Sequence, residues 1–248
     1  LGTAPRQSLA AAGVIDFACV GTMVWLLEPR RLRRFLLDGA RPLEPSLALD
    51  ADADALAASI GENAHTALVL GARPALANGL YDRVSAEPFD LADDERAFPL
   101  HGRRVLLAGK SALRFVEVGR GEAGRAMLTD AGEIRAAGAL FAGRAVAMLT
   151  RDEHNDLFWV LRPNGSLIHK VIVPRAERWA LAENRGVALV ASAEGNLVVV
   201  DLRYGRVQSE AAPPWPVHDL DVDSDGQYVV LAGEPDASGT PVLHVPST

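Results

Sequence analysis

Short apolar segments recur along the chain at nearly even intervals, and turns rich in glycine, asparagine and aspartate separate them. Six of these segments share a corresponding position, at Val24, Ala67, Val105, Val146, Val187 and Val229, with steps of 43, 38, 41, 41 and 42 residues. A repeat of about 40–45 residues with several short strands is typical of a β-propeller blade. The 248 residues accommodate six such repeats. The pattern therefore predicts an all-β fold, a six-bladed β-propeller of four-stranded antiparallel blades, with residues 1–248 as a single domain.

The fifth repeat shows the four expected strands most clearly. Its four short runs cover residues 179–182, 187–192, 197–202 and 206–210, with glycine-containing turns between them. Short runs rich in Val and Leu, separated by such turns, predict an antiparallel meander. In the fourth repeat, Pro163-Asn164-Gly165 lies between two β-rich runs and is the strongest hairpin signal in the chain.

The last and the first repeats fit the pattern less completely. The last has runs only at residues 217–222, 227–233 and 241–245. We expect residues 6–10, or a flanking segment, to supply its fourth strand, because a sheet edge has to be covered. Near the start, residues 51–60 are rich in alanine, and a short helix over residues 52–59 is an alternative to a strand. The chain opens on Leu1 rather than Met, which is compatible with one domain of a longer protein.

Composition and net charge limit the classes of binding partner and the cellular compartment that we expect for this chain. With 49% hydrophobic and 23% charged residues, the chain is typical of a globular domain. Its net charge of −7 disfavours nucleic acid, since binding a phosphate backbone requires a basic face. Cys19 is the single cysteine, so no disulfide forms within the chain, and we expect a cytoplasmic location. The longest apolar run, residues 17–27, is too short to span a membrane.

A family resemblance accompanies the repeat. Residues 221–233 read D-x-x-x-D-G-Q-Y-V-V-L-A-G, which resembles the WD-repeat and quinoprotein-like propellers, although the Gly-His start and Trp-Asp end of WD units are absent. The divergent repeats, rich in alanine and arginine, also resemble bacterial propeller modules that accompany MoxR-type ATPases and von Willebrand A domains. The resemblance implies a propeller and carries over no catalytic residue. It implies a protein partner, such as an AAA+ ATPase or a von Willebrand A domain protein.

Two acidic segments are candidate cation sites. Asp219, Asp221, Asp223 and Asp225 alternate before Gly226, and such carboxylates can gather around calcium. The favoured interpretation is a strand that ends in an Asp-Gly turn. Residues 152–156 (DEHND) also concentrate possible ligands, but contiguous ligands rarely converge on one ion, so a solvated loop is favoured.

No catalytic constellation stands out in the sequence. There is no G-x-S-x-G elbow, and Cys19 lies in an apolar run where an inert buried thiol is expected. We therefore predict a non-enzymatic protein-interaction scaffold with no cofactor, catalytic residue or metal site. The alternative is a lactonase-like, cation-dependent hydrolase with its site at the mouth of the propeller channel.

One dense basic run suggests where a partner docks. Arg30, Arg31, Arg33 and Arg34 reverse the charge of an otherwise acidic chain, and a basic patch beside apolar residues can bind an acidic partner. Trp215 lies among prolines and is a second candidate contact. The alternative is that these arginines line a strand edge and keep it soluble.

Overall fold

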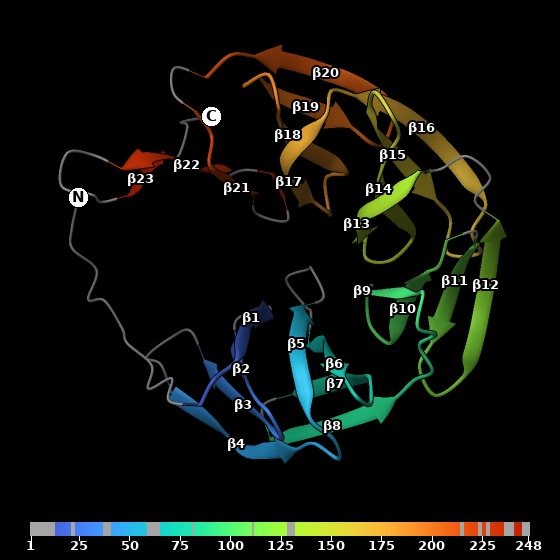
Figure 1. Cartoon of the computed structure of the whole chain (residues 1–248), viewed down its shortest axis with the longest axis vertical. Coiled ribbons are helices and arrows are strands. Elements are labelled where there is room, and N and C mark those ends of the chain that lie inside the picture. The colour runs from blue at the N-terminus through green and yellow to red at the C-terminus, as the bar shows by residue number, and fades with distance from the viewer. Residues whose placement is uncertain are drawn as a thin grey trace. The chain divides into compact units, whose positions relative to one another are not determined.

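The computed structural model describes residues 13–20, 23–36, 41–58, 65–80, 82–110, 112–127, 132–213, 216–222, 225–226, 229–235 and 241–244. Within these ranges the elements are β-strands, arranged in six sheets (Figure 1). Five sheets have four strands and one has three. Consecutive strands are hydrogen-bonded neighbours in every sheet, as in meanders built from tight turns. The predicted all-β class and the four-stranded units are confirmed.

The first two sheets are built from residues 16–88. The first contains β1 (Asp16–Val20), β2 (Met23–Glu28), β3 (Arg31–Leu36) and β4 (Arg41–Ala48), and the second contains β5 (Ala53–Ala58), β6 (Thr66–Gly71), β7 (Ala75–Leu80) and β8 (Arg83–Pro88). The alternative of a short helix over residues 52–59 is wrong. Cross-strand pairing of β5 with β6 decides the structure, because a short isolated helix is marginal.

Fifteen further strands form the other four sheets. The third sheet has β9 (Arg96–Pro99), β10 (Arg104–Ala108), β11 (Ala112–Glu117) and β12 (Gly121–Met127), and the fourth has β13 (Glu133–Leu140), β14 (Ala145–Arg151), β15 (Asp156–Leu161) and β16 (Leu167–Val173). The fifth has β17 (Ala176–Ala182), β18 (Val187–Ser192), β19 (Leu197–Asp201) and β20 (Arg206–Ala211), and the last has β21 (Asp219–Val222), β22 (Val229–Pro235) and β23 (Pro241–His244). The predicted fourth strand of the last sheet, residues 6–10, lies outside the described residues.

The recurring apolar segments lie on the second strands of the sheets. In the first five sheets, β2, β6, β10, β14 and β18 are largely buried on both faces. In β6, Ala67 and Val69 pack in one core cluster with Trp25, whereas Leu68 packs in another with Leu107. Alternate residues of one strand therefore contact two different neighbouring sheets. Burial on both faces explains why these strands are continuous apolar runs rather than alternating ones.

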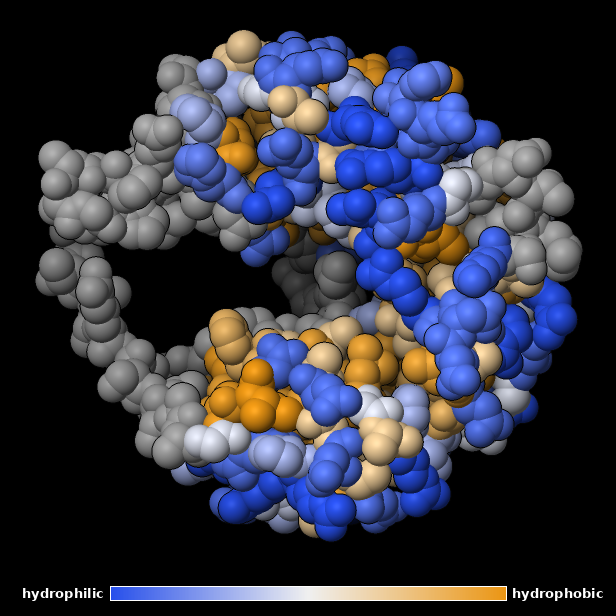
Figure 2. All heavy atoms as spheres, in the orientation of Figure 1, coloured by the Kyte–Doolittle hydropathy of each residue, from blue (hydrophilic) through white to orange (hydrophobic). Residues whose placement is uncertain are grey.

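Contacts divide the chain into two compact units. The first unit comprises Leu1–Leu107 and Val116–Glu122, and the second comprises Ala108–Phe115 and Ala123–Thr248. On the face that Figure 2 shows, apolar side chains gather over β1 to β8, whereas polar side chains predominate over β13 to β20. The described part of the chain contains no helix long and apolar enough to cross a membrane.

Candidate functional site

The four arginines of the basic run do not form one patch. Arg30 lies in the turn between β2 and β3 and is exposed, as is Arg31 at the start of β3. Arg33 is half-buried, with its Nε 2.7 Å from Glu28 Oε1. Arg34 is only 1% exposed. Successive residues of a strand point to opposite faces, so Arg33 and Arg34 diverge. The expectation of four arginines on one surface is therefore wrong for Arg34.

Arg34 is buried between the first two sheets. Its Nη1 donates to the carbonyl of Arg83 at 3.3 Å, and its Nη2 donates to the carbonyl of Pro45 at 3.2 Å. Burial lowers the pKa of Arg34, and the nearby carboxylate of Glu44 opposes this shift. Arg34 therefore joins β3, β4 and β8 inside the fold, where it is inaccessible to a partner.

The loop between β4 and β5 carries two ion pairs with neighbouring turns. Arg30 Nε donates to Asp52 Oδ1 at 2.6 Å, and this hydrogen bond raises the pKa of Arg30. Arg73, in the turn between β6 and β7, contacts Asp50 Oδ2 through Nη1 at 3.2 Å. Arg31, by contrast, donates from Nε to the neutral hydroxyl of Ser46 at 3.0 Å. Exposed arginines and carboxylates thus alternate along one rim of the first unit.

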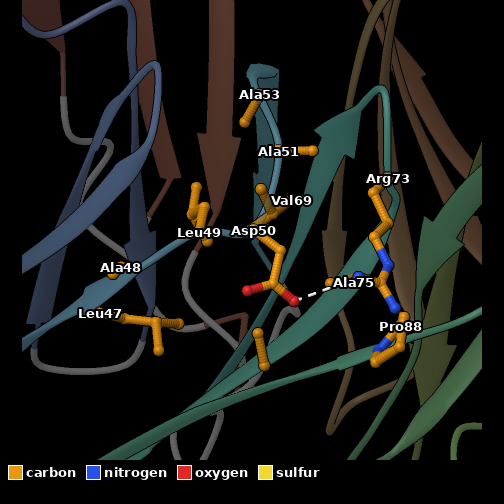
Figure 3. Close-up of a pocket in the computed structure, with 11 residues that line it drawn as sticks. Leu47, Ala48, Leu49, Asp50, Ala51, Ala53, Val69, Arg73, Ala75 and Pro88 are labelled. Carbon is orange, nitrogen blue, oxygen red and sulfur yellow. Dashed lines mark hydrogen bonds and ion pairs between the residues drawn. The ribbon is translucent and has the colours of Figure 1, made fainter.

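A pocket of about 210 Å³ opens beside this rim. Apolar groups form its walls: Leu47, Leu49, Ala53, Val69, Ala75 and Pro88. Figure 3 shows Leu47 and Leu49 on one side and Arg73 and Pro88 on the other, with the ion pair from Asp50 to Arg73 between them. Asp50 remains 82% exposed in its side chain, so the charged pair borders the pocket rather than filling it. Several separate segments, 47–53, 69–75 and 86–88, build the pocket.

A second hollow adjoins the first. It measures about 410 Å³, includes Phe89, Asp90 and Leu91 in its lining, and shares Arg73 and Pro88 with the pocket. The two hollows together give the first unit a depression that continues past Arg73. The sequence does not reveal this pocket, because most of its lining residues are common apolar types with no recurring spacing along the chain. The only local signal is the pair of carboxylates Asp50 and Asp52 directly after a strand end.

The acidic segment at residues 152–156 serves the fold. Asp152 Oδ1 accepts from the backbone nitrogens of His154 and Asn155 at 2.8 and 2.7 Å, and these bonds lower the pKa of Asp152. Asp156 is fully buried, contrary to the expected solvated loop. It accepts from Arg151 Nε at 2.8 Å and from the backbone nitrogen of Ala176 at 2.8 Å, so it joins β15 to β17.

The other sequence candidates lie only partly within the described residues. Asp221 Oδ1 accepts from the backbone nitrogen of Val222 at 2.8 Å, and Asp225 Oδ1 accepts from Asn184 Nδ2 at 3.2 Å. Asp223 and Trp215 fall outside the described ranges. The minor alternative of a cation held by Asp221, Asp223 and Asp225 is therefore not tested. Within the ranges that the structure describes, no three His, Cys, Asp or Glu residues gather as a metal site requires.

Comparison with known proteins identifies the fold. No protein-family model and no curated protein matches the sequence. The β-propeller domain of Cps50 (Swd1) from Myceliophteria thermophila matches with a TM-score of 0.65 and 10% identity, over 95% of this chain and 84% of that domain. KlHsv2 with loop 6CD replaced by a Gly-Ser linker matches with a TM-score of 0.54 and 10% identity, over 94% of this chain and 97% of that one. This chain has a β-propeller fold.

These structural similarities show the fold of this chain and nothing about its function. At 10% identity, the binding properties of either protein do not transfer to this chain. The predicted β-propeller is confirmed. The predicted association with MoxR-type ATPases and von Willebrand A domains receives no support from these comparisons.

Proposed function

We propose that this chain is a non-enzymatic protein-interaction scaffold whose partner docks on the pocket and its rim. We call this the rim surface. We define it by the pocket, by Asp50 and Arg73, which line it, and by Arg30 and Arg31, which contact Asp52 and Ser46 on either side of the segment 47–51 of its lining. The observation that carries the proposal is a pocket lined by apolar side chains together with the charged pair Asp50 and Arg73, built where strand ends of β4 to β8 meet the loops that join them. Loops on a rigid scaffold are where binding residues concentrate.

The pocket taken alone is smaller than most small-molecule sites, although the adjoining hollow of about 410 Å³ is not, so the charged border and not the volume favours a protein partner. Small-molecule sites usually enclose about 300–1,000 Å³, and the pocket measures about 210 Å³. A single apolar side chain suits this volume, and the adjoining hollow gives room for the chain that carries it. Arg31 has a neutral partner, so acidic residues beside the inserted side chain can pair with it.

Several finer features belong to the same proposal. The scaffold is a six-bladed propeller, and residues 1–248 form this propeller as a single domain. Its partner is an AAA+ ATPase or a von Willebrand A domain protein in the cytoplasm. Trp215 is a further contact. The three-stranded last sheet and the propeller fold support the blade number, whereas the partner and the location rest on the sequence resemblance and on the single cysteine.

Charge reversal at the rim tests the proposal. The double variant Arg30→Glu/Arg31→Glu should capture its specific partners from a lysate about fivefold more weakly, with a flatter salt dependence, because both effects follow from losing exposed charges. The matched control is Arg144→Glu/Arg185→Glu, which reverses two exposed arginines in the second unit. Identical capture by both variants and the parent, at every salt concentration, would reject the rim surface.

Metal analysis separates the scaffold from the hydrolase alternative. A cation-dependent hydrolase retains its ion through purification when the site is built for it. The scaffold predicts no stoichiometric calcium or zinc in protein dialysed against metal-free buffer. One equivalent of calcium or zinc in the parent protein would favour the hydrolase, provided that the double variant Asp221→Asn/Asp225→Asn no longer holds the ion.

A further inference from the structure

The last strand of the fourth sheet, β16, presents large aliphatic side chains to solvent. Leu167, Ile168 and Ile172 are 50%, 36% and 63% exposed. β16 ends the hydrogen-bonding order of its sheet, with β15 as its one neighbour there. An edge strand directs alternate N–H and C=O groups away from its sheet, where another strand can pair with them. β16 thus combines an open edge with exposed apolar side chains.

The corresponding strands of the other four-stranded sheets carry features that block such pairing. Proteins protect edges with proline, with charged residues and with glycine-disrupted strands. The protecting residues are Pro42 and Pro45 in β4, Glu87 and Pro88 in β8, Gly121, Glu122 and Gly124 in β12, and Arg206 and Glu210 in β20. β16 reads LIHKVIV, with no proline or glycine. Its one fixed charge, Lys170, disfavours pairing with a strand that offers no opposite charge, but not with one that carries a carboxylate.

Lys170 is held in position at the centre of the strand. Its Nζ lies 4.3 Å from the centre of the Trp159 ring, and Trp159 Nε1 donates to Thr150 Oγ1 at 2.8 Å. Lys170 pairs with Trp159, and Ile172 pairs with Leu157, so both lie on one face of the sheet. Ile168 lies at a register shift between β15 and β16, but it is exposed like Lys170 and Ile172, whereas Val171 and Val173 are buried. The exposed face of β16 therefore offers a positive charge with an isoleucine on either side of it.

A second copy of this chain fits this edge poorly. In a twofold antiparallel pair of β16 strands, Ile172 of one copy faces Ile168 of the other only in the register that places Lys170 opposite Lys170. Like charges directly opposite each other destabilise a sheet. Two other twofold registers place Ile168 opposite Ile168 or Ile172 opposite Ile172, but they pair only one end of each strand. The remaining registers with the same face alignment place an isoleucine opposite Lys170. The occupant should therefore carry the opposite charge.

We propose that β16 binds an extended segment of a partner protein, which adds a fifth strand to the fourth sheet. The segment has the pattern aliphatic-x-acidic-x-aliphatic: its carboxylate faces Lys170, and its aliphatic residues face Ile168 and Ile172. Backbone hydrogen bonds supply affinity, and the alternating side chains supply specificity. This site lies in the second unit and does not depend on the rim surface.

A designed peptide tests the proposal on the whole chain. The probe is a fluorescein-labelled, disulfide-cyclised β-hairpin whose free strand reads Thr-Val-Thr-Glu-Thr-Val-Thr, because preorganisation limits the entropy lost on binding. Fluorescence anisotropy should show saturable binding that weakens about fivefold when Lys replaces the Glu of the probe. The variant Lys170→Glu should reverse this preference. N-methylation of the free strand's outward-facing nitrogens should abolish binding, since it removes the backbone hydrogen bonds.

Protein variants complete the experiment. Ile168→Thr/Ile172→Thr should weaken binding about tenfold, whereas Val207→Thr, at a similarly exposed position on β20, should not change it. The rim variant Arg30→Glu/Arg31→Glu should bind the hairpin like the parent, so failure of one proposal leaves the other standing. Absence of saturable binding, or equal binding of the N-methylated probe, would overturn the proposal. So would a dimer of the parent chain in sedimentation that Ile172→Thr dissociates.

Discussion

The guanidinium of Arg34 is buried between the first two sheets, and the neighbouring residues leave space and hydrogen-bond acceptors for it. Gly79 faces its guanidinium: a Cβ there would lie 2.8 Å from Arg34 Nη1 and 2.9 Å from Trp25 Cζ2. Two carbonyl oxygens accept its hydrogen bonds. A buried charge is tolerated when such partners replace water. Arg34 therefore contributes to stability and not to the surface charge of the basic run.

Replacement of Arg34 should be far more damaging than replacement of its exposed neighbour. Arg34→Glu places an unpaired carboxylate among carbonyl oxygens and should lower the free energy of unfolding by about 3–5 kcal/mol. Arg31→Glu, at an exposed position, should change it by about 0.5 kcal/mol or less. Urea unfolding followed by tryptophan fluorescence measures both. Similar midpoints for the two variants would contradict the burial of Arg34.

Asp156 makes a second prediction at the residue scale. Asp156→Asn removes the charge that holds Arg151 and weakens the bond from the backbone of Ala176. Asp156 is fully buried, but Arg151 is 25% exposed and also donates to the carbonyl of Ala176, so the loss should cost about 1–3 kcal/mol, less than for a fully buried pair. Glu153→Gln, which removes the same charge from an exposed neighbour, is the control and should be nearly neutral. Equal unfolding midpoints for both variants would show that Asp156 is not a structural tie.

At the scale of elements, the hairpin between β15 and β16 depends on its turn. Gly165 has a φ of +85°, and its nitrogen donates to the carbonyl of Arg162 at 2.8 Å. Gly165→Ala should therefore cost about 1 kcal/mol, whereas Gly165→Asn should cost less, because Asn tolerates positive φ better than Ala. Thermal unfolding of the two variants checks the order. A more stable Ala variant would show that the turn does not require this conformation.

The strands also differ in how well the sequence pattern predicts them. Strands β15 to β19 were predictable because most of their apolar runs are separated by short polar turns, and the turns at Gly165, Gly186 and Gly195 contain glycine. β5 was ambiguous, since alanine favours helix and only pairing with β6 decides otherwise. The strand period also indicates that neighbours Arg33 and Arg34 point apart, a signal that a count of positive charges ignores. The pocket was not predictable, because segments distant in sequence meet only in the folded first unit.

At the scale of the whole molecule, the described residues give the last sheet one strand fewer than the other five. An unpaired sheet edge invites pairing with another chain, and propellers leave only short, protected edges. The chain has a β-propeller fold by its similarity to solved structures. This arrangement supports the prediction that residues 6–10 complete the last sheet as its fourth strand.

Deletion of residues 1–11 tests this closure. If residues 6–10 pair with the last sheet, their loss should speed hydrogen exchange in β21 to β23 by about tenfold or more, because protection reports the free energy of local opening. Exchange in β13 to β16 should change little, since those strands form a separate sheet. Deletion of residues 246–248 serves as the control for trimming a terminus. Unchanged exchange in β21 to β23 after the first deletion would mean that residues 6–10 do not pair with that sheet.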